Sequence, residues 1–453
     1  MAKRLSKENQ ALLDRLKKQG VRYLIPSYVD MHGISKGKTV PIEHFNRMMS
    51  GSELCTGAAL DGVPQVVQDE EIAAHPDPKS ATILPWNPEM CWFASDLWAY
   101  GKPFEANGRL ILKRQLEAAA KMGFTFNVGI ECEFFVLRED ENGEHVPVSE
   151  LDDIDKAAYD TRLPLHNYAW LDEIVSSMNG LGWDVYSFDH EDTNGQWEID
   201  FAYADALTMS DRFTFFRLML KEICREHGLL ATFMPKPWSN RTGSGAHLNM
   251  SLADKKTGKN LFEDAKDRRE CDTSKLGYKF IAGVLKHAQA IVAVTCPTVN
   301  SYKRLTVSGS MTGYTWAPAF ACYGGNNRTN LLRVPLGGGR VECRGADIGM
   351  NPYLGMALAL AAGLEGIREN ADPGEPHMEN VYEKSPAQRR REKIKPLPRT
   401  LVEGIDAVKR DPLVEKVFGK EMFDSWVQFR EEEWASYHNH VSDWERKRYL
   451  KFW

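Results

Sequence analysis

The first hundred residues carry several short patterns of apolar and polar positions. Apolar residues recur every three or four positions over residues 4–19, which predicts an amphipathic helix. Runs of apolar and aromatic residues predict strands over 21–29 and at 40–41. Residues 50–105 are rich in Gly, Pro and Asp and poor in helical periodicity, so we expect loops and short strands there. The pattern predicts a small N-terminal domain, residues 1–105.

Longer patterns alternate in the rest of the chain. Helical periodicity covers 109–122, about 204–227, 274–295, 352–370 and much of 401–453. Strand patterns fall at 125–137, 183–188, 197–201 and 247–252. Because several successive strands have no helix between them, we expect an α+β fold, with a mainly antiparallel sheet backed by helices in a second domain, residues 106–453. Residues 371–400 combine several prolines with a basic cluster and are typical of a solvated surface segment.

Composition excludes several classes of protein. Hydrophobic residues make up 43% of the chain and charged residues 26%, as in soluble globular proteins. Lys and Arg number 57 against 63 Asp and Glu, and a net charge of -6 argues against a protein that binds nucleic acid. The 8 Cys are scattered, which favours reduced thiols. No apolar run reaches the roughly 20 residues that cross a membrane, and the start of the chain does not resemble a signal peptide, so we expect a cytoplasmic protein.

Two pairs of Glu residues are the first candidates for chemistry. Glu131 and Glu133 stand two apart in an otherwise apolar strand, so their side chains project from one face. Such a strand does not bury two like charges unless a cation neutralises them. Glu191 and Glu198 lie on either side of a turn that contains Gly. Each pair alone also fits solvated side chains on an exposed strand or in a polar hairpin.

A polar face and a group of Arg residues follow. His247, Asn249 and Ser251 alternate along a strand after the loop Gly-Ser-Gly at 243–245, although a lone His on a strand is more often structural. The Arg residues are Arg304, Arg328, Arg333, Arg340 and Arg344, with Glu342 between the last two. Arg binds phosphates and carboxylates through paired hydrogen bonds, while surface ion pairs are the alternative for each one. Together the five Glu, the His and the Arg group predict a hard-cation site beside a polyanion.

The order and spacing of these segments resemble the glutamine synthetase family over nearly the whole chain. The matching segments are GIECEFF, DHEDTNGQWEI, TFMPKP with GSGAHLNMSL, NSYKRL, NNRTNLLRVP and RVECRGAD. Earlier in the chain, VDMHGISKGKTVP and ALDGVP are similar to the family's small β-grasp-like N-terminal domain.

The resemblance implies substrates, metals and residue roles. One Mg²⁺ or Mn²⁺ is expected on Glu133, Glu191 and Glu198, and a second on Glu131, His247 and Glu342. L-glutamate is expected at Glu133, Arg304, Arg344 and the backbone of Gly243. ATP is expected at Ser251, Arg328, Arg333 and Arg340. Catalytic roles fall to Arg328, to Arg344 and to Asp61, which corresponds to the acid that binds ammonium and removes its proton.

The family also implies a reaction and an assembly. The reaction is an ATP-dependent ligation of glutamate to a small amine through γ-glutamyl phosphate. The assembly is a homo-oligomer, a dodecamer of two stacked hexameric rings, in which a neighbour's N-terminal domain completes each site.

Two departures from the family pattern bear on the acceptor. Asn249 stands where many members have a second His. The segment YKRLTVSGSMTGYTWAP is longer than the family's flap and carries Thr315 and Trp316, near Tyr314, where a Glu is expected. This resembles the divergent subgroup of γ-glutamylmethylamide synthetases and type III-like glutamine synthetases, and so favours methylamine. The alternatives are ammonium as acceptor, or an inactive structural or regulatory homologue, against which the six filled ligand positions argue.

Overall fold

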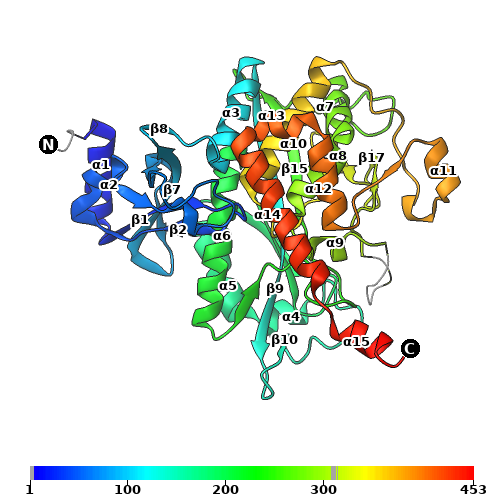
Figure 1. Ribbon diagram of the computed structural model, residues 1–453, viewed down its shortest axis with the longest axis horizontal. Helices are drawn as coiled ribbons and strands as arrows, with labels where there is room; N and C mark the ends of the chain where they lie inside the picture. Colours follow the sequence, from blue (N-terminus) through cyan, green and yellow to red (C-terminus); the bar gives the residue numbers. More distant parts are fainter. Residues whose placement is uncertain (1–4, 308–312, 314, 453) are drawn as a thin grey trace.

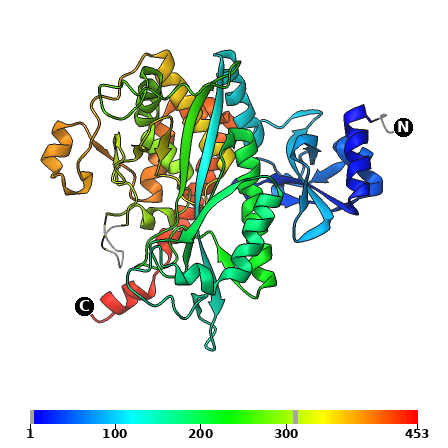
Figure 2. The same cartoon turned by 180° about the vertical axis from the view of Figure 1, so that it is seen from behind.

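The chain is built around two β-sheets that lie at different ends of the molecule (Figure 1). The computed structural model describes residues 5–307, 313 and 315–452. The N-terminal elements lie together at one end in both views, and the larger sheet with its helices fills the rest (Figures 1 and 2).

The N-terminal sheet has the strand order β2-β1-β7-β5-β4, with β3, β6 and β8 paired to its central strands. Its strands are β1 (Tyr23–Val29), β2 (Ser35–Gly37), β3 (Val40–Pro41), β4 (Glu53–Cys55), β5 (Ile72–Pro76), β6 (Thr82–Leu84), β7 (Asn87–Ala99) and β8 (Lys102–Pro103). The expectation of only short strands over 50–105 was wrong for the 13-residue β7. Its centre is buried on both faces, so it lacks the alternation that marks a half-buried strand.

A separate small core holds α1 (Lys7–Lys18) and α2 (Phe45–Met49) on this sheet. The helix α1 begins at Ser6, whose side chain accepts a hydrogen bond from the amide of Asn9. The buried guanidinium of Arg109 joins the two parts of the molecule. It donates to Asp96 of β7 and to Asp77, which follows β5, in the N-terminal part and to Asp211 in the larger part, at 2.8–3.0 Å. Charge pairing therefore fixes how the parts sit together.

The larger sheet runs β11-β12-β9-β15-β19-β18-β17, and its pairs are antiparallel except β17 with β18. Its strands are β9 (Phe124–Glu139), β10 (His145–Pro147), β11 (Val185–His190), β12 (Gln196–Phe201), β13 (Ala204–Asp205), β14 (Leu230–Thr232), β15 (Ala246–Asp254), β17 (Tyr323–Gly325), β18 (Leu332–Val334) and β19 (Val341–Cys343). A two-stranded sheet pairs β16 (Phe320–Ala321) with β20 (Lys395–Pro396). The predicted α+β class, with a mainly antiparallel sheet and helices, is confirmed.

Helices pack behind the long central strands (Figure 2). They are α3 (Gly108–Lys121), α6 (Ala206–Glu226), α7 (Lys275–Lys286), α8 (Ala288–Thr295), α10 (Pro352–Arg368), α12 (Leu401–Arg410), α13 (Pro412–Phe418) and α14 (Lys420–Asn439). Shorter or peripheral ones are α4 (Arg162–His166), α5 (Tyr168–Gly180), α9 (Ser301–Arg304), α11 (Pro386–Arg391) and α15 (Asp443–Tyr449). Every helix in the described part of the chain is too short or too polar to span a bilayer.

The helix predicted over 274–295 is two helices, α7 and α8, which meet at His287. The buried ring of His287 contacts Asp411 at 2.8 Å and Glu365 at 3.0 Å. These tertiary contacts favour a break that the apolar pattern does not reveal.

Candidate active site

Strand pairing brings the predicted acidic residues together. On β9, Glu131 lies opposite His247 of β15, and Glu133 lies opposite Glu198 of β12. On the far side of β15, Glu342 of β19 lies opposite Asn249. Residues from four strands therefore meet around one short stretch of β9.

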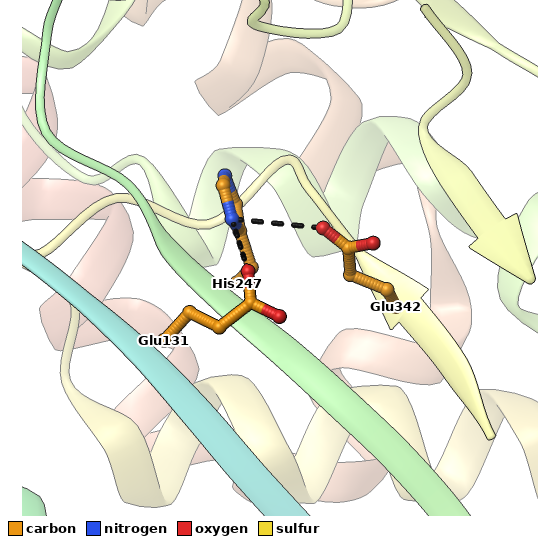
Figure 3. A group of neighbouring side chains, drawn as sticks. All are labelled: Glu131, His247 and Glu342. Carbon is orange, nitrogen blue, oxygen red and sulfur yellow. Dashed lines mark hydrogen bonds and ion pairs between the residues drawn. The ribbon is translucent and has the colours of Figure 1, made fainter. Parts of the chain in front are cut away.

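Glu131, His247 and Glu342 form the first group (Figure 3). The imidazole Nδ1 of His247 lies 2.9 Å from Glu131 Oε2 and 3.6 Å from Glu342 Oε1. Asn249 donates from Nδ2 to Glu131 Oε1 at 2.8 Å, and Arg333 donates from Nη1 to Glu342 Oε2 at 2.6 Å. Arg344 also donates from Nη1 to Glu342 Oε1, so the neighbours orient both carboxylates around His247.

Glu133, Glu191 and Glu198 form the second group, in which one oxygen from each lies within 4.8 Å of the others. The backbone amide of Gly245 donates to Glu133 Oε2 at 2.6 Å. His247 links the groups, because its Nε2 lies 3.5 Å from Glu133 Oε1. One imidazole thus stands between two neighbouring carboxylate clusters.

The turn that carries Glu191 is held by Asp152, a residue that the sequence patterns did not single out. Asp152 Oδ2 accepts from the amide of Gly195 at 2.6 Å and lies 2.9 Å from His190 Nε2. Asn194 donates to the other oxygen at 2.9 Å. A buried carboxylate therefore replaces the backbone partners that the turn lacks.

The electrostatics of the two groups differ. Burial raises the pKa of Glu131, but the hydrogen bond and charge of His247 outweigh it and lower that pKa to about 2. Burial, followed by the charge of Glu133, raises the pKa of Glu191 and of Glu198 well above the usual range. Among the described residues, no Lys or Arg forms an ion pair with either of these two side chains.

The donor set fits divalent cations. Carboxylate oxygens with a single imidazole are ligands for Mg²⁺ and Mn²⁺. Buried like charges without a basic partner are unfavourable unless a cation neutralises them. The second group therefore has both the ligands and the electrostatic need for a metal ion.

A cavity of about 350 Å³ opens beside the second group. Its lining includes Glu133, Glu191 and His247 on one side and Arg304, Arg328 and Arg344 on the other. Burial lowers the pKa of Arg344, but the charges of Glu342, Glu131 and Glu133 outweigh it and raise that pKa. Arg344 is therefore a permanent cation in a buried position, suited to a carboxylate.

Glycine is needed at the loop that lines this cavity. A Cβ at Gly243 would lie 2.4 Å from the carbonyl oxygen of Pro235 and 2.9 Å from Arg304 Cγ. Arg304 donates to the backbone carbonyls of Gly345 and Arg344 at 3.0 and 3.1 Å. The loop thus packs directly on a fixed guanidinium.

A second cavity, of about 430 Å³, lies on the side of the first group. Glu131, Asn249, Ser251 and Arg340 contribute polar groups, and Arg340 donates from Nε to Asn249 Oδ1 at 2.9 Å. Aromatic and glycine residues form the rest of its wall, among them Tyr186, Phe201, Tyr203, Gly338 and Gly339. Apolar aromatic walls beside a cation suit a nucleotide.

The family model for the catalytic domain of glutamine synthetase matches residues 105–449. The chain belongs to the glutamine synthetase family. The glutamate–methylamine ligase of Methyloversatilis universalis is 43% identical over 440 residues, which is 96% of this chain and 98% of that protein. The glutamine synthetase of Rhizobium meliloti is 37% identical over 433 residues, 95% and 97% of the two chains.

Solved structures of this family superpose closely. The structure named "GmaS/ADP complex-Conformation 1" gives a TM-score of 0.90 at 36% identity, covering 97% of this chain and 99% of that one. The structure named "Apo GmaS without ligand" gives 0.88 at the same identity. The chain is thus a glutamine synthetase-family ligase with the fold of these proteins.

Four residues predicted for the site line neither of the two cavities, and two of them, Glu198 and Glu342, belong to the carboxylate groups described above. Asp61 has 67% of its side chain exposed and lies 3.5 Å from His32, so its role, like the predicted dodecamer, stays a prediction that concerns a neighbouring subunit. Arg333 contacts Glu342 and Asn326 and lines neither of these two cavities. Its assignment to the nucleotide phosphates also stays a prediction.

Sequence patterns missed two residues that line the first cavity. Ala158 and Tyr159 come from an irregular loop with no periodicity. Tyr159 has a φ of 63°, and Trp316 in the same wall has a φ of 54°. Left-handed backbone at bulky residues is uncommon and clusters at functional sites. Tyr314, named above with the flap, lies outside the described residues.

Proposed function

We propose that this ligase joins the γ-carboxylate of L-glutamate to methylamine at the expense of ATP. The observation that carries the proposal is the first cavity, where carboxylates of the second group, His247 and three Arg side chains meet a wall of Trp316, Ala317 and Ala158. The relative that is 43% identical, a glutamate–methylamine ligase, supports the same acceptor.

The two cavities suggest where each substrate binds. ATP fits the second cavity, with its base among the aromatic side chains and its phosphates directed past Arg340 toward β9. Glutamate fits the first, with Arg304 near its α-carboxylate and Arg344 near its γ-carboxylate. Bidentate guanidinium contacts orient a carboxylate as well as neutralise it.

The reaction then takes two steps. A γ-carboxylate oxygen attacks the γ-phosphorus of ATP, the bond to ADP breaks, and γ-glutamyl phosphate forms. The neutral amine attacks the acyl carbon, phosphate leaves with the bonding pair, and a proton is lost from nitrogen. Bound divalent ions would neutralise the charge of the phosphates during the transfer.

The protein's own residues supply position and charge. Arg344 holds the γ-carboxylate while Arg328 faces the same cavity and meets the transferred phosphoryl group. Asp61 of a neighbouring subunit would take the proton from the amine. Six ligand positions filled by Glu and His also argue against an inactive homologue.

The acceptor wall, formed by Trp316, Ala317 and Ala158, should bind methylamine more tightly than ammonium. A methyl group buried against Trp316 and Ala317 gains about 1 kcal/mol, or about fivefold in binding. An ammonium ion gains nothing from such a surface and depends on charge and hydrogen bonds alone.

The test compares kcat/KM for the two amines through phosphate release, each corrected for its free-base fraction. We expect methylamine to be preferred, and Trp316→Ala to lower its kcat/KM about fivefold while the value for ammonium stays within twofold. Trp444→Ala is the matched control, because Trp444 is 65% exposed on α15. A corrected preference for ammonium would make the protein a glutamine synthetase, and no turnover with either amine would favour an inactive homologue.

A further inference from the structure

The segment around 376–397 packs directly against the chain that forms the acceptor wall. Val381 and Ile394 are buried in a small core with Cys322, and Phe320 packs on it. The amide of Val381 donates to Thr329 Oγ1 at 3.1 Å. The prediction of a solvated surface segment is therefore wrong for this part of residues 371–400, which is buried against residues 320–322.

Three attachments connect the segment to residues 317–321. The strands β16 and β20 pair, and the amide of Leu397 donates to the carbonyl of Ala319 at 3.0 Å. Nearest the cavity, the hydroxyl of Tyr382 donates to the carbonyl of Ala317 at 2.7 Å. Ala317 is buried and lines the first cavity.

The backbone of Trp316 and Ala317 is held from both sides. Arg344 donates from Nη2 to the carbonyl of Trp316 at 3.4 Å, a long contact, whereas the bond from Tyr382 is short. Because Trp316 has a φ of 54°, its backbone conformation is unfavourable for a bulky residue and persists only where its surroundings restrain it. The Tyr382 hydroxyl restrains this backbone from outside the site.

We propose that Tyr382 is a positioning residue that sets the amine-binding wall of this ligase. The inference rests on the proposed function, in which Trp316 and Ala317 contact the acceptor. Tyr382 does not touch the substrates; it fixes the carbonyl of Ala317, the residue that follows Trp316. Loss of its hydroxyl should therefore weaken amine binding and leave the ATP and glutamate sites in place.

The test is Tyr382→Phe, which removes one oxygen and keeps the ring. We expect the KM for the preferred amine to rise about fivefold, equal to about 1 kcal/mol. The KM values for ATP and glutamate, and kcat at saturating amine, should stay within twofold. Tyr323→Phe is the matched control, because Tyr323 also donates its hydroxyl to a backbone carbonyl, that of Gly374, at 2.5 Å in the same region.

Hydrogen exchange provides a readout that does not depend on turnover. Amides within 315–321 should exchange faster in Tyr382→Phe than in Tyr323→Phe or the parent protein. An unchanged amine KM, or equal rises in all three KM values in both variants, would overturn the proposal. If ammonium proves to be the acceptor, the same rise is expected for ammonium, and if neither amine reacts, unchanged exchange over 315–321 overturns the positioning role.

Discussion

Glu133→Gln tests whether the second carboxylate group holds a divalent cation. The substitution keeps the size of the side chain and removes one of three negative charges. Two charges 4.8 Å apart repel by about 3.5 kcal/mol at an effective dielectric constant of about 20. The change removes two of the three pairwise repulsions in the group, which involve Glu191 and Glu198.

Protonation limits how much of this repulsion the metal-free protein experiences. At pH 7.5 one Glu of the group can remove the repulsion by binding a proton, and protonating a free Glu side chain at this pH costs about 4 kcal/mol. Unfolding entropy near 2.1 cal/mol/K per residue gives about 1 kcal/mol per degree for 453 residues. We therefore expect the metal-free variant to melt about 2–4 °C above the parent protein.

Added Mg²⁺ should stabilise the parent protein more than the Glu133→Gln variant. The parent protein should gain several degrees in Tm with saturating Mg²⁺, and Glu133→Gln should gain clearly less, with kcat/KM at least about 100-fold lower. Glu139→Gln, on the exposed end of the same strand, is the control and should behave as the parent protein. An equal Mg²⁺-dependent rise in Tm for Glu133→Gln and the parent protein would refute the assignment.

Two further predictions follow from the site. Arg344→Lys keeps the charge but loses the paired hydrogen bonds. Glutamate-dependent phosphoryl transfer should therefore fall at least tenfold, while ATP binding, measured by calorimetry, should stay within threefold. Weakened ATP binding with intact phosphoryl transfer would contradict the role of Arg344. Burial raises the pKa of Asp189 to about 6 and that of Asp200 to about 7, so the folded metal-free protein holds protons that the unfolded chain releases. This contribution to stability is complete below about pH 4 and is lost as pH rises through 6–7. Without metal, Asp200→Asn should therefore raise Tm more at pH 8 than at pH 5. An equal rise in Tm at both pH values would contradict the raised pKa of Asp200.

Local patterns were sufficient for the parts of the site that lie within one strand. Glu131 and Glu133 share a face because side chains alternate along a strand, and that rule needs no tertiary information. The grouping with Glu198 and His247 depends on the pairing of β9 with β12 and β15, which no local pattern contains. That grouping was predicted through the resemblance to a family.

Irregular segments were the least predictable from sequence. Asp152 and Tyr159 lie in an irregular loop without periodicity. Asp152 contacts a turn some forty residues away in the chain, and Tyr159 lines the first cavity. The support by Tyr382 is of the same kind, since a single hydroxyl meets a carbonyl 65 residues earlier. Side-chain contacts between loops leave no regular signal in the sequence of either loop.

Two carboxylates on one face of β9, two residues apart, line the two cavities. Glu131 faces the cavity with the aromatic wall, and Glu133 faces the cavity with the Arg side chains. His247 contacts both, so two cations bound to the groups would be close neighbours and would repel each other. Two divalent ions would bring four positive charges to the five carboxylates, and the guanidinium groups of Arg333 and Arg344 on Glu342 add two more, so the metal-bound site would suit anionic substrates such as a triphosphate and a carboxylate. In the proposed function, the carboxylate clusters would bind the metals together with both substrates, with the phosphoryl donor and acceptor next to each other on one face of β9.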